Sequence, residues 1–439
     1  MRNMALINET VKNIGTPVHI LDVEVFNRNL SAILDASKII EKFKLFYSLK
    51  TNYLPTILEK IVKSGLGADV VSGYELRAAL EQGFSPESIV FNGPMKNDDE
   101  LLLALDLGIF INIDSPEEAF RVDNLARCKG ITAKVGIRLN PNINMYPSHD
   151  NTYNSQMERK ARLSKFGWPT KELDVLFEVF KSCTSLKLTG IHCQLGSQID
   201  DLKSLNSAFS DICFAAKKLN EKFPLEMINF GGGIAVPGIC RTRNGPLLEL
   251  VGCLSDIIIP DERSSYTIEE YFFAIQSALT EHKLTFLTVA IEPGRAIVSD
   301  AMFMISSVVN KKSNKFGAWV VLDAGLNLLP TAGPTEKHNI YALTMHEGPL
   351  RKYIVGGPLC YEHDIFSYSL ELPAALEIGD HIVIEDTGAY SISRATNFIR
   401  ERAPVVSIEE NRATLVWRRE TYSDIFSFST NTPIEHHNK

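Results

Sequence analysis

The stretch Lys44-Leu-Phe-Tyr-Ser-Leu-Lys50-Thr-Asn52 is a short apolar run that ends in a lysine. Such a run is typical of a buried strand. It is the first of eight, at residues 45–49, 68–71, 89–91, 109–113, 133–139, 188–193, 227–230 and 289–291. The spacers have helical length, and Leu54-Ile57-Leu58-Ile61-Val62 shows helical periodicity. Eight alternations of strand and helix predict a parallel sheet that closes into a (β/α)8 barrel.

The pattern becomes β-rich beyond Ala301, with runs such as Trp319-Val-Val-Leu and His381-Ile-Val-Ile between turn signals. We therefore expect an α/β barrel over residues 36–300 and an all-β domain over residues 301–425. Residues 1–35 are expected to add a strand to the β-domain, and the tail 426–439 is expected to be disordered. Residues 140–167 form a candidate active-site loop, and residues 238–265 form a candidate insertion.

Composition narrows the class of protein. With 439 residues, 45% hydrophobic residues, a net charge of -8 and a pI near 5.8, the chain predicts a soluble globular protein without a nucleic-acid footprint. Seven scattered cysteines fit neither a disulfide framework nor a metal site. The chain has no signal peptide and no apolar stretch of roughly 18 residues, so we expect a cytoplasmic protein without a membrane partner.

Lys50 is the first candidate catalytic residue. Burial of an unpaired ammonium is costly and lowers the pKa of a lysine, which makes the neutral amine a nucleophile. Such an amine can form an imine with a carbonyl cofactor. The alternative is that Lys50 is a solvated strand end.

Two later segments supply a phosphate site. Gly231-Gly232-Gly233 follows a strand-like run, and its backbone could approach a phosphate closely, although a glycine triplet is also an ordinary turn. In Glu292-Pro-Gly-Arg295, the arginine could bind phosphate and the glutamate could pair with a pyridine nitrogen, or the two could form a local ion pair. The glycine triplet follows the seventh predicted strand, and Glu292-Pro-Gly-Arg295 follows the eighth. Barrels of this kind commonly bind phosphate after these two strands.

Two further residues lie in the expected β-domain. Cys360, in Gly356-Gly-Pro-Leu-Cys360, could donate a proton, although free cysteines are mostly buried packing residues. Tyr390, in Glu385-Asp-Thr-Gly-Ala-Tyr390, could reach a phosphate or be a half-buried aromatic residue.

These five segments, in this order, resemble the fold-type III pyridoxal phosphate decarboxylases, which include diaminopimelate, ornithine and arginine decarboxylases. Alanine racemase is a more distant relative that has the same barrel. The resemblance implies a homodimer with shared active sites, bound pyridoxal 5'-phosphate and an amino-acid substrate. It also implies that Lys50 bears the cofactor and that Cys360 of the partner subunit protonates the intermediate. The cofactor-binding residues that it implies, beside Lys50, are Asp69, Arg138, Gly231, Gly232, Gly233, Glu292, Gly294, Arg295 and Tyr390, with Glu75 as a supporting residue.

The chain departs from the family pattern in Gly190-Ile-His192-Cys-Gln194-Leu-Gly-Ser197. Gln194 stands where the family has a histidine that stacks on the cofactor ring. His192 lies on the same strand face and could take over part of this contact, or it could be a core histidine. Ser197 remains a candidate phosphate donor.

The second departure concerns the far end of the substrate. Asp323-Ala-Gly-Leu-Asn327-Leu-Leu-Pro-Thr331 lacks the arginine and tyrosine with which diaminopimelate decarboxylases bind the distal carboxylate. Tyr361 stands where those enzymes have an acid, and Glu362 follows it. We take Asn327, Thr331, Tyr361 and Glu362 as candidate substrate contacts, in a pocket that is not built for diaminopimelate.

The preferred function is α-decarboxylation of an amino acid or diamino-acid derivative, possible in a specialised biosynthetic pathway. The alternatives are a diaminopimelate decarboxylase of lysine biosynthesis, an amino-acid racemase and a non-catalytic binding protein. Glu292 favours decarboxylation over racemisation, because racemases of this fold leave the ring nitrogen unprotonated against an arginine. Gln194 keeps the non-catalytic alternative open.

Overall fold

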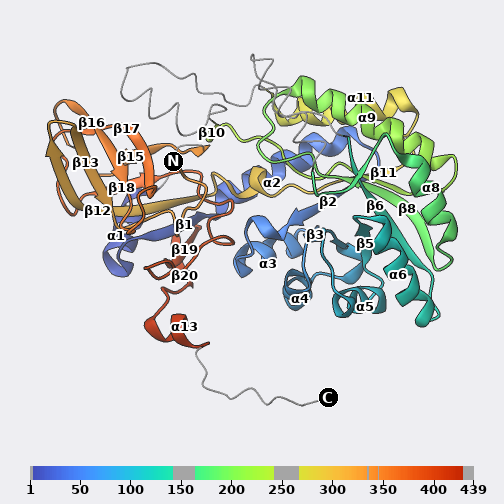
Figure 1. The fold of residues 1–439 in the computed structure, drawn as a ribbon. Coiled ribbons are helices and arrows are strands. Elements are labelled where there is room, and N and C mark those ends of the chain that lie inside the picture. The colour runs from blue at the N-terminus through green and yellow to red at the C-terminus, as the bar shows by residue number, and fades with distance from the viewer. Residues whose placement is uncertain (1–2, 142–163, 242–265, 334–335, 345, 429–439) are drawn as a thin grey trace. The chain divides into compact units, whose positions relative to one another are not determined.

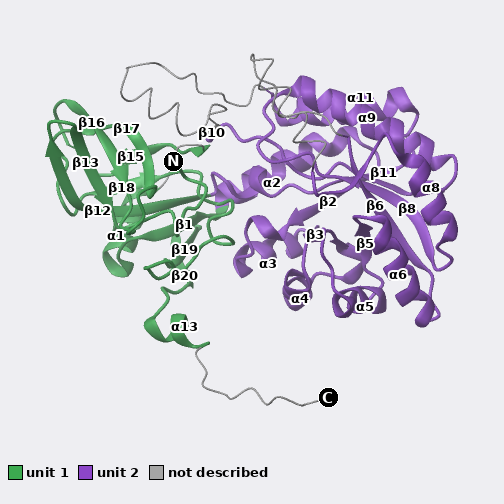
Figure 2. Ribbon diagram, viewed as in Figure 1, with its two compact units in different colours: residues 1–23, 244–259, 302–439 green, residues 24–243, 260–301 purple. Residues whose placement is uncertain are grey.

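The structure is a computed structural model that describes residues 3–141, 164–241, 266–333, 336–344 and 346–428. It divides into two compact units (Figure 2). Among the described residues, one unit comprises residues 24–241 and 266–301, and the other comprises residues 3–23 and those from 302 onward.

The first unit contains a closed barrel of parallel strands, as predicted. Its eight strands run in the order β5-β4-β3-β2-β11-β9-β8-β6, and pairing of β5 with β6 closes the ring. The short β7 (Trp168–Pro169) extends β6. The barrel strands are β2 (Phe43–Ser48), β3 (Gly67–Val70), β4 (Ile89–Phe91), β5 (Phe110–Ile113), β6 (Ala133–Asn140), β8 (Leu186–Cys193), β9 (Met227–Asn229) and β11 (Thr288–Ile291).

Helices surround these strands (Figure 1). Several begin at a side chain that caps the first turn: Asn97 and Thr267 form capping boxes with Glu100 and Glu270. Helix α9 buries the apolar face that its periodicity predicts, including Phe209. The helices of this unit are α2 (Val23–Ala36), α3 (Pro55–Lys63), α4 (Gly73–Glu81), α5 (Asp98–Asp106), α6 (Pro116–Cys128), α8 (Leu173–Ser182), α9 (Leu202–Asn220), α11 (Ile268–His282) and α12 (Arg295–Val298), with 3-10 turns η1 (Ser37–Ile39), η2 (Leu49–Thr51) and η3 (Pro86–Ser88).

Helix α2 belongs to the barrel unit from residue 24 onward, whereas the sequence analysis drew this boundary after residue 35. The physical reason is visible in its contacts. Arg28 Nη2 lies 2.7 Å from Asp300 Oδ2, and Asn29 Nδ2 donates to the carbonyl oxygen of Ile297 at 3.1 Å. Polar side chains of α2 thus bind the segment that follows β11.

The second unit is a β-domain. Its sheet has the order β17-β16-β13-β12-β1-β19-β20, and β18 pairs with both β12 and β15. The N-terminal strand β1 is antiparallel to β12 and parallel to β19. The elements are α1 (Met4–Ile14), β1 (Val18–Asp22), β12 (Met302–Asn314), β13 (Gly317–Leu322), β15 (Ile340–Ala342), β16 (Leu350–Gly356), β17 (Ile365–Pro373), β18 (His381–Ile384), β19 (Val405–Glu409), β20 (Arg412–Trp417) and α13 (Tyr422–Phe426). The short strands β10 (Cys240–Arg241) and β14 (Glu336–Lys337) lie outside the two large sheets.

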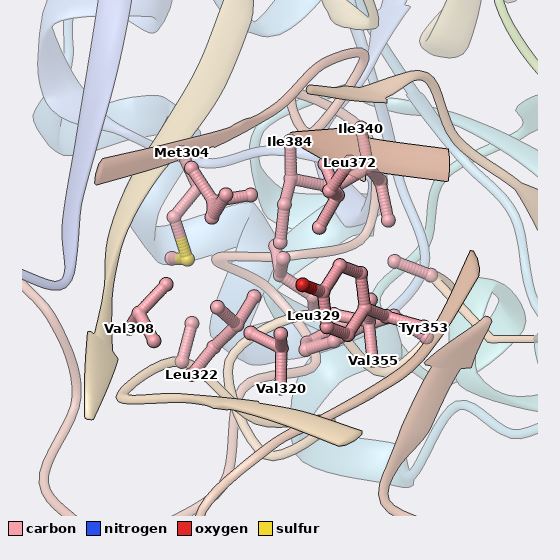
Figure 3. Close-up of a cluster of buried hydrophobic side chains, with 14 of the residues drawn as sticks. Met304, Val308, Val320, Leu322, Leu329, Ile340, Tyr353, Val355, Leu372 and Ile384 are labelled. Carbon is pink, nitrogen blue, oxygen red and sulfur yellow. The ribbon is translucent and has the colours of Figure 1, made fainter. Parts of the chain in front are cut away.

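The β-domain has its own hydrophobic core (Figure 3). Side chains from β12, β13, β16 and β18 meet there, among them Met304, Val320, Val355 and Ile384. Each such side chain contributes about 1.5–3 kcal/mol when it is fully buried. The core also takes up Leu329, from the segment 323–331 that the sequence analysis linked to the substrate.

Three predicted features lie wholly or largely outside the described residues: the loop 140–167, the insertion 238–265 and the tail 426–439. In the part of the chain that is described, no helix combines the length and the apolar character needed to cross a membrane.

Candidate functional site

The polar residues that the sequence analysis singled out in the barrel lie where its strands end. Lys50 follows β2, Asp69 lies in β3, Arg138 and His192 lie in β6 and β8, and Glu292 follows β11. The strands are parallel, so their carboxyl ends meet at one mouth of the barrel, where enzymes of this architecture carry their active sites.

Lys50 is held by a buried carboxylate. Its Nζ lies 2.5 Å from Asp69 Oδ2 and 2.6 Å from Ser48 Oγ, and Ser48 Oγ also donates to Asp69 Oδ2 at 2.6 Å. Asp69 is fully buried, whereas the Lys50 side chain is 35% exposed. The amine is therefore anchored on one side and accessible on the other.

Glu292 is a buried carboxylate with three side-chain partners. Asn92 Nδ2 and Asn229 Nδ2 donate to its Oε1 at 2.8 and 2.7 Å, and His192 Nε2 lies 3.0 Å from its Oε2. The Glu292 and His192 side chains are each 1% exposed. This shell fixes the carboxylate in a site from which water is excluded.

The charge of Glu292 is stabilised by its neighbours. Burial by itself raises the pKa of a carboxyl, but the charges of His192 and Lys50 and the hydrogen bonds from His192 and Asn92 lower the pKa of Glu292 to about 2. Glu75 behaves in the opposite way. Burial raises the pKa of Glu75 to about 7, although the Val71 amide donates to its carboxylate. The site thus contains two carboxyl groups with different pKa values: Glu292 is strongly ionised, and Glu75 titrates near neutral pH.

The glycine turn after β9 has no room for side chains. A Cβ on Gly232 would overlap the backbone oxygen of Glu292, and a Cβ on Gly231 would overlap that of Cys193. Gly231 and Gly233 have φ values of 66° and 99°, which glycine adopts without strain. At Gly294, after β11, an added Cβ would overlap the side chain of Thr51. Glycine is therefore required at these positions because neighbouring protein atoms occupy the space where a side chain would begin.

Two of the three glycine amides are already engaged by side chains. Gly231 N donates to Asn229 Oδ1 at 2.9 Å, and Gly232 N donates to Gln194 Oε1 at 2.7 Å. Gln194 Nε2 in turn donates to the carbonyl oxygen of Gly196 at 2.5 Å. Gln194 therefore ties the loop after β8 to the glycine turn, and His192 is directed to Glu292.

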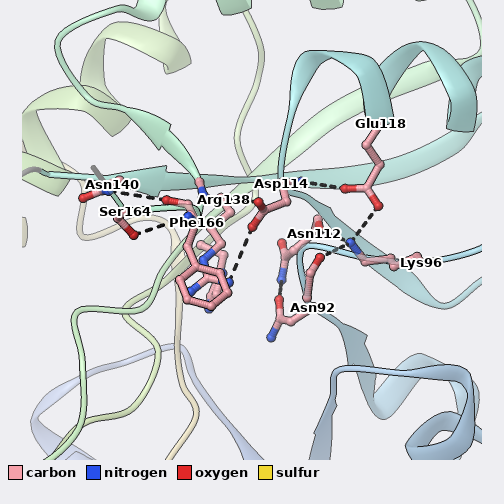
Figure 4. A network of polar contacts seen from close by, with 12 residues as sticks. Asn92, Lys96, Asn112, Asp114, Glu118, Arg138, Asn140, Ser164 and Phe166 are labelled. Atoms are coloured by element: carbon pink, nitrogen blue, oxygen red, sulfur yellow. Dashed lines mark hydrogen bonds and ion pairs between the residues drawn. The ribbon is translucent and has the colours of Figure 1, made fainter. Parts of the chain in front are cut away.

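Arg138 belongs to a polar network that Figure 4 shows. Its Nη1 lies 3.5 Å from Asp114 Oδ1, and its guanidinium lies 4.4 Å from the centre of the Phe166 ring. Asp114 N donates to Glu118 Oε2, and Glu118 Oε1 lies 2.9 Å from the Nζ of the fully buried Lys96. Burial lowers the pKa of Lys96, while Glu118 opposes this shift. Breaking such a pair costs about 3–5 kcal/mol, so the Lys96–Glu118 pair stabilises the segment after β5 that holds Asp114 next to Arg138 of β6.

The remaining candidates in the barrel are Arg295, three residues after Glu292, and Ser197, three residues after Gln194. Arg295 begins α12 and is 6% exposed, and Ser197 is half-buried in the loop after β8. Both follow strands that contribute to the same mouth of the barrel.

The other candidates lie in the β-domain. Cys360, Tyr361 and Glu362 are exposed, Thr331 and Tyr390 are half-buried, and Asn327 is buried. The backbone oxygen of Asn327 accepts from Thr396 N at 2.9 Å, and its side-chain Nδ2 donates to the Thr396 backbone oxygen at 3.4 Å. Tyr390 has a φ of 62°, a left-handed conformation that is uncommon for an aromatic residue and recurs at functional sites.

Sequence reasoning missed the buried side chains that contact Lys50, Asp69, Asn92 and Glu292. Ser48 binds Lys50 and Asp69, Asn92 joins Asp69 to Glu292, Asn112 donates to Asn92, and Asn229 donates to Glu292. Each lies in a strand or directly after one. That position at the carboxyl end of a barrel strand is the signal that could have identified them.

The residues present fit pyridoxal phosphate. A lysine whose side chain is 35% exposed can attach an aldehyde, and a buried ionised carboxylate can hold a protonated ring nitrogen. The backbone of the glycine turn, with positive φ at Gly231 and Gly233, can form part of a cradle for a phosphate. The three features lie at the ends of β2, β11 and β9, which are neighbours in the barrel.

Comparisons with known proteins agree with this chemistry. The family model for the pyridoxal binding domain of pyridoxal-dependent decarboxylases matches residues 26–299. The chain is 30% identical to the diaminopimelate decarboxylase of Helicobacter pylori over 418 residues, which covers 94% of this chain and 95% of that protein. It is 30% identical to that of Bacteroides thetaiotaomicron, covering 88% and 94% of the two chains.

Solved structures show the same relation. The diaminopimelate decarboxylase of Helicobacter pylori in complex with L-lysine superposes with a TM-score of 0.81 at 28% identity, covering 96% of this chain and 98% of that one. The enzyme of M. jannaschii in complex with L-lysine gives a TM-score of 0.84 at 26% identity, covering 98% and 95%. The chain therefore belongs to the pyridoxal-dependent decarboxylases, enzymes that use pyridoxal phosphate to remove carbon dioxide from amino acids.

Proposed function

We propose that this chain decarboxylates an amino acid or diamino-acid derivative at a site built around Lys50 and Glu292. When bound, pyridoxal phosphate supplies an aldehyde and an electron-withdrawing ring. The observation that supports the proposal most is the pair of anchors: Lys50 on buried Asp69, and Glu292 in a shell of three donors.

The chain's own residues have separate roles in this proposal. Lys50 would hold the cofactor through its aldehyde, and Glu292 would keep the ring nitrogen protonated. Gly233, Gly294, Arg295, Ser197 and Tyr390 are assigned to the phosphate. Cys360 is assigned to the delivery of a proton to the carbon that has lost its carboxylate. Ionised Glu292 favours this chemistry over racemisation, which needs a weaker electron sink.

The proposed substrate carries a less charged distal end than diaminopimelate. The segment 323–331 has no cationic residue, and its Leu328 and Leu329 are buried in the β-domain core. Tyr361 has an exposed ring that lies 5.4 Å from that of His363, and it offers no carboxylate for a distal ammonium. Diaminopimelate decarboxylation remains the second candidate, because the relatives described above have that activity.

A carbon dioxide release assay separates the two substrates. We expect kcat/KM for meso-diaminopimelate to be at least about 30-fold below that of the best amide-linked or distally neutral diamino acid, because about 2 kcal/mol is lost when a charged group meets no partner. The screen uses the enzyme loaded with pyridoxal phosphate and L- and D-amino acids. Turnover of meso-diaminopimelate as fast as that of the best compound would contradict this substrate assignment. No release from any amino acid, despite bound cofactor, would favour a non-catalytic role.

The proposal includes a homodimer in which Cys360 of one subunit serves the Lys50 site of the other. Mixing inactive Lys50→Ala with inactive Cys360→Ala is expected to restore about a quarter of the wild-type activity, because statistical heterodimers then contain one intact site. Subunit exchange is followed with two affinity tags. Exchange without any recovery of activity would show that the sites are not shared.

We also propose a cytoplasmic location. The described cysteines 128, 183, 193, 213 and 360 are free thiols, as is usual in a reducing compartment.

A further inference from the structure

Asn92 contacts two carboxylates with one nitrogen. It follows β4 and is 3% exposed. Its Nδ2 donates to Asp69 Oδ1 at 2.6 Å and to Glu292 Oε1 at 2.8 Å. It therefore connects the carboxylate that anchors Lys50 to the carboxylate assigned to the ring nitrogen.

The orientation of this amide is determined by its other contacts. Asn112 Nδ2 donates to Asn92 Oδ1 at 2.7 Å (Figure 4). The backbone of Asn92 is held as well, because its N–H donates to the Val70 oxygen at 2.8 Å. With its oxygen occupied by Asn112, the amide presents both Nδ2 hydrogens to the carboxylates.

Two ionised carboxylates around one atom in a buried site repel each other, and repulsion of this kind drives one of them to take up a proton. A donor shared between them opposes this, because it hydrogen-bonds the charged form of both. The other titratable groups that face them are Lys50 and Glu75 next to Asp69, and His192 and the Cys193 thiol next to Glu292.

We infer that Asn92 is a positioning residue that keeps Asp69 and Glu292 ionised together, and thereby links the charge state at Lys50 to that at the ring nitrogen. This inference rests on the proposed attachment of the cofactor to Lys50. Asn92 itself touches neither reacting bond. Its effect is expected in the protonation of the site, which the absorbance of the bound cofactor reports.

Asn92→Asp tests the inference, because it replaces the shared NH2 donor by a carboxylate oxygen. The side chain keeps nearly the same size, and three carboxyl groups then lie close together. One of the three carboxyls must then hold a proton near neutral pH. In the wild-type holoenzyme, Glu75 is the group expected to titrate between about pH 6 and pH 9, and the wild-type cofactor spectrum over this range is the reference. The variant is expected to show an additional spectral transition with a midpoint inside this range, and its affinity for pyridoxal phosphate should fall at least about tenfold from the acid to the alkaline end.

Asn97→Asp is the matched control. Asn97 is exposed at the N-cap of α5, five residues further along the chain, and aspartate caps a helix as well as asparagine does. It adds the same charge without touching the network, so its spectrum should match that of the wild type. A transition of equal size in Asn97→Asp would overturn the inference.

Asn112→Ala is the second variant, and it adds no charge. Removing the donor to Asn92 Oδ1 lets the amide rotate, so a weaker transition in the same pH range is expected. Spectra of folded Asn92→Asp that show no transition beyond that of the wild type would overturn the role of Asn92. If Asn92→Asp does not fold, spectra of Asn112→Ala identical to those of the wild type decide against it. Borohydride labelling of the wild type outside Lys50 would instead overturn the site assignment, and this inference with it.

Discussion

Lys50→Ala is expected to lose covalent attachment of the cofactor and to lower kcat by about three orders of magnitude or more. The reason is that, in the proposed site, the Lys50 amine held by Asp69 would attach the cofactor. The measurement is borohydride reduction of the yellow holoenzyme followed by peptide mapping. The label should appear on the wild-type peptide that contains Lys50 and be absent from the variant.

Lys44→Ala provides the comparison. Lys44 lies in β2, six residues before Lys50, and is exposed. Its replacement should leave both labelling and activity close to those of the wild type. A label elsewhere in the chain, or an unchanged cofactor absorbance in Lys50→Ala, would remove Lys50 from the mechanism.

Glu292→Gln is expected to reduce kcat/KM on the order of 10²-fold or more, because an uncharged amide cannot hold a proton on the ring nitrogen. It also replaces one acceptor oxygen by an NH2 group, which then faces either the Asn92 and Asn229 amides or the His192 ring. We therefore expect a loss of about 3–5 kcal/mol in the free energy of unfolding as well, the usual result of breaking a buried charged network. Steady-state kinetics and denaturant unfolding measure the two effects.

The contribution of Glu292 to the free energy of unfolding depends on pH, and its pKa gives the direction of this dependence. Its pKa in the folded protein lies below the ordinary value of 4.5. The stabilisation is therefore complete above the unfolded value and is lost as the pH falls through the folded value, near 2. The difference in unfolding free energy between wild type and Glu292→Gln should be constant at neutral pH and shrink only in strong acid.

Glu269→Gln, an exposed site on α11, is the control and should show neither the kinetic nor the stability change. Equal activity of Glu292→Gln and wild type would contradict the role of this carboxylate.

The proposed cofactor site combines residues that the family resemblance implies with altered surroundings. Lys50, Glu292 and the glycine turn lie at the ends of the neighbouring strands β2, β11 and β9. Gln194, however, uses both polar atoms of its amide in hydrogen bonds to backbone groups. Its Oε1 accepts from Gly232 N in the glycine turn, and its Nε2 donates to the Gly196 oxygen in the loop after β8. The resemblance to diaminopimelate decarboxylases therefore supports the reaction type more strongly than it supports the substrate.

The barrel could be predicted from the sequence because its signals are local. Short apolar runs alternate with segments of helical periodicity, and the alternation itself implies parallel strands. Lys50, the glycine turn and Glu292 follow such runs directly, so their meeting at one end of the barrel follows from the strand count. The β-domain was recognisable for the same reason, since β13, β16, β18 and β20 are apolar runs between turns.

The connections between these residues depend on the tertiary structure alone. Asn92 and Glu292 are 200 residues apart, and an asparagine after a strand is indistinguishable in sequence from an ordinary turn residue. Only closure of the ring places β4 and β11 near enough for one amide to reach both Asp69 and Glu292. The direction of the Gln194 side chain was undetermined for the same reason, because it depends on hydrogen-bond partners that other strands supply. Local patterns thus determined the elements and the ends of the strands, whereas pairing between distant polar groups was decided by the folded barrel, where a buried donor or acceptor without a partner is costly.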